Sequence, residues 1–120
     1  MKEYVSVDVE TTGLAPKQDK IIEIGAVRVR DGQIVGSFTC FVNPGRILPA
    51  HITELTGILQ EQVDEAETME SVLPAFLEFA GDLPLMGHRI LFDYGFLKRA
   101  AVNMRLDFER SGVDTLKLSR

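Results

Sequence analysis

The sequence predicts an α/β protein with a mixed β-sheet flanked by helices, and three observations support this. β-Rich segments come first, apolar residues at helical spacing follow, and a short strand, a helix and another strand close the chain. A meander of strands followed by crossover connections is typical of such a sheet. We expect one domain, residues 1–120, because this length and an apolar fraction of 45% suit a single globular core.

The first three strands are indicated by alternation and turn chemistry. Val5, Val7 and Val9 alternate with polar residues, which predicts a strand with one face in a core. Residues 20–44 form two β-rich runs joined at Asp31-Gly32, a strong hairpin signal. Asn43-Pro44-Gly45 ends the second run.

The remaining elements are predicted from helical periodicity. Residues 52–58 indicate a short turn or helix, and residues 68–81 a helix that stops at Gly81, with Pro74 in its first two turns. Residues 83–88 predict a short apolar strand and residues 90–106 a further helix. Residues 112–120 predict a last strand and the first turn of another helix.

Composition excludes some classes of protein. The net charge of −5 does not suit a generic nucleic-acid-binding surface, so a cation at an acidic site would have to attract such a substrate. Cys40 is the sole cysteine and cannot form an internal disulfide, which favours a buried reduced thiol. Neither an apolar leader nor a membrane-length segment is evident, and we expect a cytoplasmic protein without membrane contact.

Two acids end the first strand. Asp8 and Glu10 are two residues apart and therefore point to the same face. Paired carboxylates repel unless a cation lies between them, and Mg²⁺ prefers such oxygen ligands. A solvated strand face is the alternative. The following Thr11-Thr12-Gly13 turn adds backbone N–H groups and hydroxyls that suit a phosphate or a terminal nucleotide.

Asp93 is the candidate for a third acid. It lies in the first turns of a helix that follows a strand, where sites of α/β proteins form. Taken alone, Asp93 is better explained as a first-turn acid favoured by the helix dipole.

Five segments, in this order, resemble the DEDDh exonuclease superfamily, which includes the proofreading epsilon subunit of bacterial DNA polymerase III and ribonuclease T. The segments are VDVETTGL, KIIEIGAV, ELTGI, GHRILFDYGFL and VDTLKLSR. The resemblance implies a ribonuclease-H-like fold and hydrolysis of phosphodiester bonds at nucleic-acid 3′ ends with two Mg²⁺ or Mn²⁺ ions. It implies a single-stranded DNA or RNA 3′ end as substrate, a nucleoside monophosphate as product, and a DNA polymerase subunit as a candidate partner.

The resemblance also assigns roles to residues. It implies Asp8, Glu10 and Asp93 as catalytic metal ligands, and a second set of residues that contact the terminal nucleotide. The second set is Thr11, Gly13, Leu14, Leu55, Thr56, Gly57, His88 and Phe92. A helix end with a C-cap glycine is an alternative for residues 55–57. Glu23 is either a supporting partner of the acids or a charged residue on a half-exposed strand.

The sequence departs from this superfamily in two ways. Arg89 stands where an asparagine often follows His88, and no histidine follows His88 to act as general base. The third motif, with its histidine and fourth acid, is absent, so we expect a domain that lacks its C-terminal helices, hydrolyses slowly, and self-associates through an uncovered sheet face. The alternative is a catalytically impaired module of the same fold that binds nucleic acid or a polymerase.

Overall fold

The computed structural model describes residues 2–106, which form one four-stranded sheet and four helices. The elements are β1 Glu3–Thr11, β2 Ile21–Arg30, β3 Gln33–Phe41, α1 Ala50–Thr56, α2 Gln60–Asp64, α3 Met69–Ala80, β4 Leu85–Met86 and α4 Ile90–Asn103. The predicted final strand at residues 112–120 lies outside the described residues.

The sheet has the strand order β3-β2-β1-β4. β1 pairs antiparallel with β2 and parallel with β4, which makes the sheet mixed as predicted. At the β2–β3 hairpin, Asp31 and Gly32 both have positive φ, 51° and 83°. These angles match the twist of the flanking strands, and Asp-Gly adopts them at low cost.

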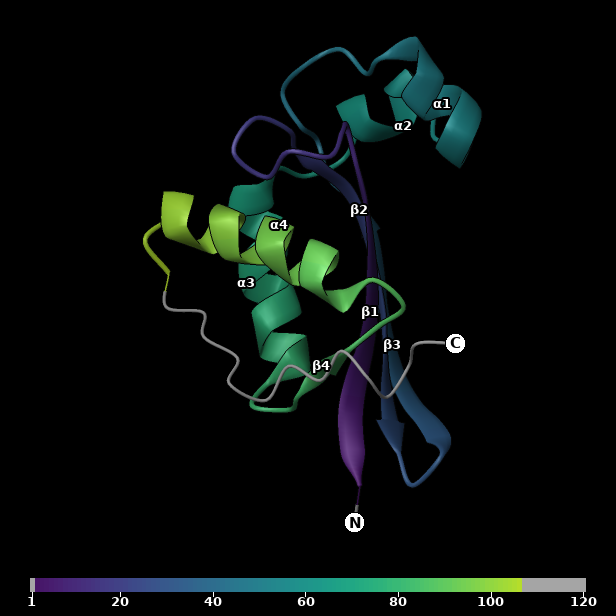
Figure 1. Ribbon diagram of the computed structural model, residues 1–120, viewed down its shortest axis with the longest axis vertical. Helices are drawn as coiled ribbons and strands as arrows, with labels where there is room; N and C mark the ends of the chain where they lie inside the picture. The colour runs from purple at the N-terminus through teal and green to yellow at the C-terminus, as the bar shows by residue number, and fades with distance from the viewer. Residues whose placement is uncertain (1, 107–120) are drawn as a thin grey trace.

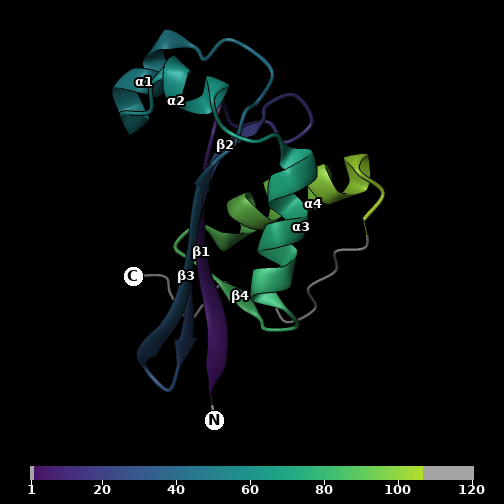
Figure 2. The same ribbon diagram turned by 180° about the vertical axis from the view of Figure 1, so that it is seen from behind.

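The main core lies between the sheet and helices α3 and α4. Val5, Val7 and Val9 of β1 are buried there, packed with α3 residues such as Phe76 and α4 residues such as Leu97. Both helices lie on one side of the sheet, and no helix of residues 2–106 covers the other side (Figures 1 and 2). Side chains that alternate with the core valines therefore face away from α3 and α4.

A second, smaller cluster joins the end of β2 to α1 and α2. Ile22 packs there with Leu48, Ile52, Ile58 and Val63. The two helices lie beyond the end of the sheet where β1 finishes, opposite the β2–β3 hairpin (Figure 1). Helix α2 was not predicted from the sequence, because it has five residues and Val63 is its one buried side chain.

β4 is shorter than the predicted strand at residues 83–88. Only Leu85 and Met86 pair with β1, opposite Val5 and Ser6. Gly87 then comes so close to β1 that an added Cβ would lie 2.6 Å from the Val7 carbonyl oxygen. Only glycine allows this approach, and the chain leaves the sheet there to begin α4.

Candidate active site

Asp8 and Glu10 lie on the face of β1 that is turned away from the core. Asp8 is exposed and Glu10 is half-buried, in alternation with the buried Val7 and Val9. The antiparallel register places Gly25 opposite Asp8, so no side chain of β2 covers that carboxylate directly. The strand therefore presents two acids together near its C-terminal end, as predicted.

Asp93 comes to the edge of β1, on the same strand as these acids, because β4 ends early. Beyond Val7, the edge of β1 is not paired to β4, and the first turns of α4 come to this edge. The Val9 backbone N–H donates a hydrogen bond to the Asp93 carboxylate. Gly87 lies next to this acid, because an added Cβ there would be in ordinary van der Waals contact, 3.8 Å, with Asp93 Oδ2.

The Asp93 carboxylate is buried, and hydrogen bonds offset only part of the free-energy cost of burying it. The residue is 2% exposed, and its Oδ2 has no hydrogen-bond partner. Burial, followed by the charge of Asp8, raises the pKa of Asp93 to about 7, although Arg89 and the Val9 N–H act in the opposite direction. An acid with this environment requires either a proton or a cation.

Glu10 and Glu23 belong to the same electrostatic cluster. They are direct partners in the β1–β2 register. Burial and then the charge of Asp8 raise the pKa of both carboxyls, and Glu23 further raises that of Glu10. Sequence reasoning took Glu23 mainly as a half-exposed strand residue. The sequence feature that pointed to Glu23 was an acid within an otherwise apolar strand. Whether such an acid joins the site depends on the register between β1 and β2.

Hydrogen bonds to the Asp19 carboxylate organise the turn after β1. Thr12 Oγ1 donates to Asp19 Oδ1 at 3.2 Å, and the Ala15 N–H donates to Asp19 Oδ2 at 3.0 Å. Thr11 Oγ1 donates to the Gly13 carbonyl at 2.5 Å. A Cβ at Gly13 would collide with the Asp19 carboxylate, which explains why glycine occupies that position. Asp19 had not been singled out from the sequence, since its partners are separated from it by a loop.

Two further groups of predicted nucleotide contacts lie directly after β1 and at the end of α1. Leu14 is 77% exposed directly after the acidic strand, and Leu55 is 79% exposed near the end of α1. Gly57 is the C-cap of α1 with φ of 79°, so the helix-end explanation of residues 55–57 is confirmed as their local role. The C-cap role leaves Leu55 free to contact a ligand.

His88 and Phe92 flank the beginning of α4. His88 is exposed, and the Phe92 ring packs 4.9 Å from the Phe96 ring, between centroids. The Arg89 guanidinium lies 4.2 Å from the Phe92 ring centroid. His51 is exposed on α1.

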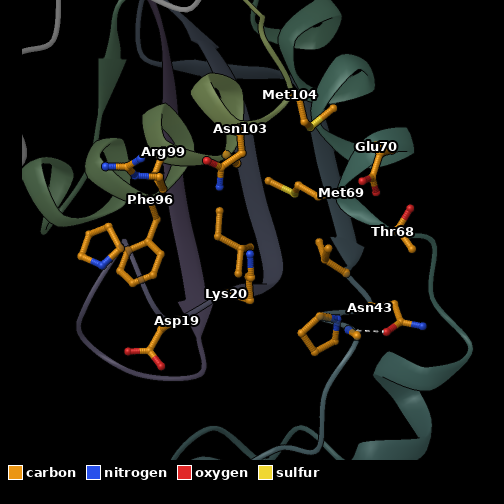
Figure 3. Close-up of a pocket in the computed structure, with 16 residues that line it drawn as sticks. Asp19, Lys20, Asn43, Thr68, Met69, Glu70, Phe96, Arg99, Asn103 and Met104 are labelled. Atoms are coloured by element: carbon orange, nitrogen blue, oxygen red, sulfur yellow. Dashed lines mark hydrogen bonds between the residues drawn. The ribbon is translucent and has the colours of Figure 1, made fainter.

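A separate cavity of about 270 Å³ lies on the helical side of the sheet. It is bounded by α4, the start of α3 and the segments at residues 16–21 and 42–45, with Phe96, Met69 and Met104 among its lining residues (Figure 3). None of Asp8, Glu10 and Asp93 lines it. The cavity is therefore not part of the acidic site.

The acids fit a divalent cation by their chemistry, although they are not closed around one point. Within residues 2–106, no three side chains of His, Cys, Asp or Glu are arranged as a ready metal cluster. Yet Asp93 Oδ2 is buried without a partner, and the donors are all carboxylate oxygens, which Mg²⁺ and Mn²⁺ prefer. No helix within this same stretch is long and apolar enough to cross a membrane.

Comparison with known sequences places the chain among exonucleases. Residues 5–120 match the RNase T family, described as exonuclease. The chain is 48% identical over 118 residues to the PolC-type DNA polymerase III of Clostridium perfringens and 43% identical over 120 residues to that of Bacillus subtilis. Each match covers 98% of this chain and 8% of the relative, so the chain spans less than a tenth of these proteins.

Comparison with solved structures supports the same fold. Exonuclease I without ligand aligns with a TM-score of 0.78 at 16% identity, over 89% of this chain and 26% of that chain. E. coli exonuclease I in complex with a dT13 oligonucleotide aligns with the same TM-score and identity, over 89% and 25% of the two chains. The ribonuclease-H-like fold is thus confirmed, and the chain belongs to the RNase T exonuclease family within the DEDD exonuclease superfamily.

Proposed function

We propose that the chain acts as a 3′–5′ exonuclease domain, removing nucleoside monophosphates from single-stranded 3′ ends of DNA. The observation that carries this proposal is the Asp93 carboxylate, buried without a partner for Oδ2 and electrostatically coupled to Asp8 and Glu10. Family membership supports phosphodiester hydrolysis as the reaction class.

Asp8, Glu10 and Asp93 are the residues proposed to hold Mg²⁺ or Mn²⁺. Two such ions, when bound, polarise the attacking water and stabilise the leaving 3′ oxygen. The chain orients its own ligands: the β-strand fixes Asp8 and Glu10 on one face, and the Val9 N–H holds one oxygen of Asp93. The second oxygen, Oδ2, is left for the cation.

The turn from Thr11 to Leu14 and the Phe92 ring are proposed to receive the terminal nucleotide. The turn is rigid because Asp19 and the Thr11 hydroxyl organise it, so it offers backbone groups beside Glu10 at low entropic cost. Leu55, Thr56 and Gly57 at the end of α1, together with His88, complete the proposed contacts. The exposed Leu14 and Leu55 are suited to pack against bases.

DNA and a polymerase context are proposed from the names of the relatives. Those proteins are PolC-type DNA polymerases III, and exonuclease I is the protein seen with an oligonucleotide. We infer a cytoplasmic location and a polymerase partner or neighbouring polymerase segment from the same context. Self-association through the open sheet face stays a prediction. Within the described residues that face carries Asp8, Glu10 and Glu23, and the repulsion between these like charges opposes such an association.

We further propose that the 120-residue chain alone hydrolyses slowly. Its two histidines are His51, exposed on α1, and His88, exposed before α4. A well-placed general base contributes a factor of about 10²–10⁴ in rate. This observation also favours a second candidate function, a binding module of the same fold that retains the acids but turns over little.

The test is hydrolysis of a single-stranded oligonucleotide under single-turnover conditions with Mg²⁺ or Mn²⁺. A 5′-labelled strand should shorten stepwise, and a 3′-labelled strand should release labelled monophosphate at once. Asp93→Asn should abolish product, while Asp82→Asn, a matched change at an exposed acid, should not. Internal cleavage, or equal rates for parent and Asp93→Asn, would contradict the proposal. Binding without product would favour the second candidate.

A further inference from the structure

Arg89 has an unusual position for a cation in this acidic chain. It is the N-cap residue of α4, directly before the turn that carries Asp93, and it is exposed. Its guanidinium lies 4.2 Å from the Phe92 ring centroid, and Phe92 in turn packs against Phe96. Stacking on an anchored ring limits the orientations available to the guanidinium.

Arg89 lies at the border of the candidate active site. Arg89 and Asp93 are one helical turn apart, and the Asp93 N–H donates to the Arg89 carbonyl at 3.0 Å. The ring on which the guanidinium stacks belongs to Phe92, the residue directly before Asp93. The backbone and the stacked side chain therefore both hold Arg89 beside the turn that carries this acid.

The hydrogen-bond donors of Arg89 are not used within the described residues. No ion pair within 4.0 Å and no side-chain hydrogen bond involves it there. Other arginines differ: Arg28 donates to the Phe79 carbonyl, and Arg46 donates to the Gln18 carbonyl. As far as residues 2–106 show, the planar fork of five N–H donors is therefore available, and its geometry matches two oxygens of one phosphate.

We propose that Arg89 binds a phosphate group of the nucleic-acid strand at the acidic site and thereby helps to select a charged backbone. The inference rests on the proposed function, since it requires that a nucleic-acid strand enters beside Asp93. The chain carries a net charge of −5, so a strand approaching this site meets repulsion unless cations oppose it. The asparagine found here in the resembling superfamily offers a neutral amide, whereas Arg89 offers a full charge.

The experiment measures binding of a fluorescent oligothymidylate to the full chain at several salt concentrations. Ca²⁺ replaces Mg²⁺, so that affinity is measured apart from hydrolysis. Arg89→Gln should weaken binding about tenfold, the effect of losing one charge-assisted hydrogen-bonded contact. The slope of log affinity against log salt should fall by about 0.7, the value for one phosphate contact on a single strand.

Three comparisons make the result specific. Arg30→Gln removes the same charge at the opposite end of the sheet, where Arg30 pairs with Glu3 in the register, and should leave the slope unchanged. Arg89→Lys should keep most of the slope but regain only part of the affinity, because lysine cannot make the bidentate contact. A neutral methylphosphonate as the 3′-terminal linkage should weaken binding to the parent by a larger factor than binding to Arg89→Gln, in which only the cation at the acids still attracts that phosphate.

Each other outcome overturns the inference. If Arg89→Gln binds with the affinity and slope of the parent, Arg89 does not contact phosphate, and the proposed exonuclease function stands without it. If Arg89→Gln binds more tightly, the guanidinium instead shields the acids from their cation. If the parent does not bind the oligonucleotide at any salt concentration, the proposed function fails and this inference fails with it.

Discussion

Asp93 links the chemistry of the site to the stability of the fold. Its pKa of about 7 in the folded protein exceeds the value of about 3.9 expected in the unfolded chain. Between these two values the native state binds more protons than the unfolded state, so stability falls as pH rises. Each unit of this difference corresponds to about 1.4 kcal/mol.

We therefore expect the metal-free protein to unfold more readily at pH 8 than at pH 5. The loss should be on the order of a few kcal/mol, because the group is buried and Oδ2 has no partner. Asp93→Asn removes the titrating group and should flatten this dependence. Urea unfolding at the two pH values provides the measurement, with Asp82→Asn as the control. An unchanged pH dependence in Asp93→Asn would show that other groups cause it.

At the scale of elements, the segment between β1 and β2 behaves as one unit built on Asp19. Its carboxylate accepts from the Thr12 hydroxyl and the Ala15 N–H, and it occupies the space that a Gly13 side chain would need. Asp19→Ala should cost about 1–2 kcal/mol of unfolding free energy through the lost hydrogen bonds. Gly13→Ala should cost about 1–3 kcal/mol through the collision with the Asp19 carboxylate.

The two changes should not be additive. In the double variant, alanine at position 19 no longer collides with the new methyl group, so the total loss should be smaller than the sum. Gly36→Ala is a suitable control, because its Cβ would meet Phe79 at an ordinary 3.6 Å. Thermal unfolding of the variants measures the coupling. Strict additivity of Asp19→Ala and Gly13→Ala would contradict this account of the turn.

Local pattern was sufficient to predict most elements but not the closeness of the acids. The Asp31-Gly32 hairpin and the β1 valines were confirmed because turn chemistry and alternation depend on adjacent residues. The helix predicted at residues 90–106 was also confirmed as α4, with Phe96, Leu97 and Ala101 buried. The Asp8 and Glu10 pair follows from the same alternation. Asp93 needed the family resemblance, since its approach depends on the early end of β4.

Cross-strand register explains what was missed. Glu23 becomes part of the acidic cluster because β2 places it opposite Glu10, and no pattern within one strand predicts that pairing. The same holds for Asp19, whose partners are at Thr12 and Ala15 across a loop. Long-range placement of polar groups is decided by tertiary packing, whereas short-range periodicity is readable in the chain itself.

At the scale of the whole molecule, a divalent cation should stabilise the fold. A ligand that binds only the native state raises stability by about 2.7 kcal/mol at a concentration of a hundred times its Kd. For a domain of this size, each kcal/mol corresponds to roughly 4–8 °C in Tm. Mn²⁺ at pH 8 should therefore raise the Tm of the parent, and Asp8→Asn should reduce the increase.

Differential scanning fluorimetry with increasing Mn²⁺, followed by calorimetric titration, measures this effect. Asp82→Asn is again the matched control and should respond as the parent does. Equal Tm increases and equal Mn²⁺ affinities for the parent and Asp8→Asn would contradict the assignment of Asp8 as a ligand. A metal-induced increase that persists in Asp8→Asn but is lost in Asp93→Asn would assign the ion to Asp93.

The short β4 has a consequence for aggregation. Where β4 stops, β1 is an edge strand as far as residues 2–106 show, and an edge strand offers its free N–H groups to any other extended chain. The hydrogen bond from Val9 to Asp93 occupies one of these donors with an acceptor that cannot propagate a ladder. The Asp93 carboxylate is thus a candidate metal ligand and also an obstacle to the addition of another strand at this edge. Asp93→Asn keeps an oxygen that can accept the Val9 hydrogen bond, whereas Asp93→Ala removes it. A comparison of the two variants therefore separates the effect of Asp93 on solubility from its effect on catalysis.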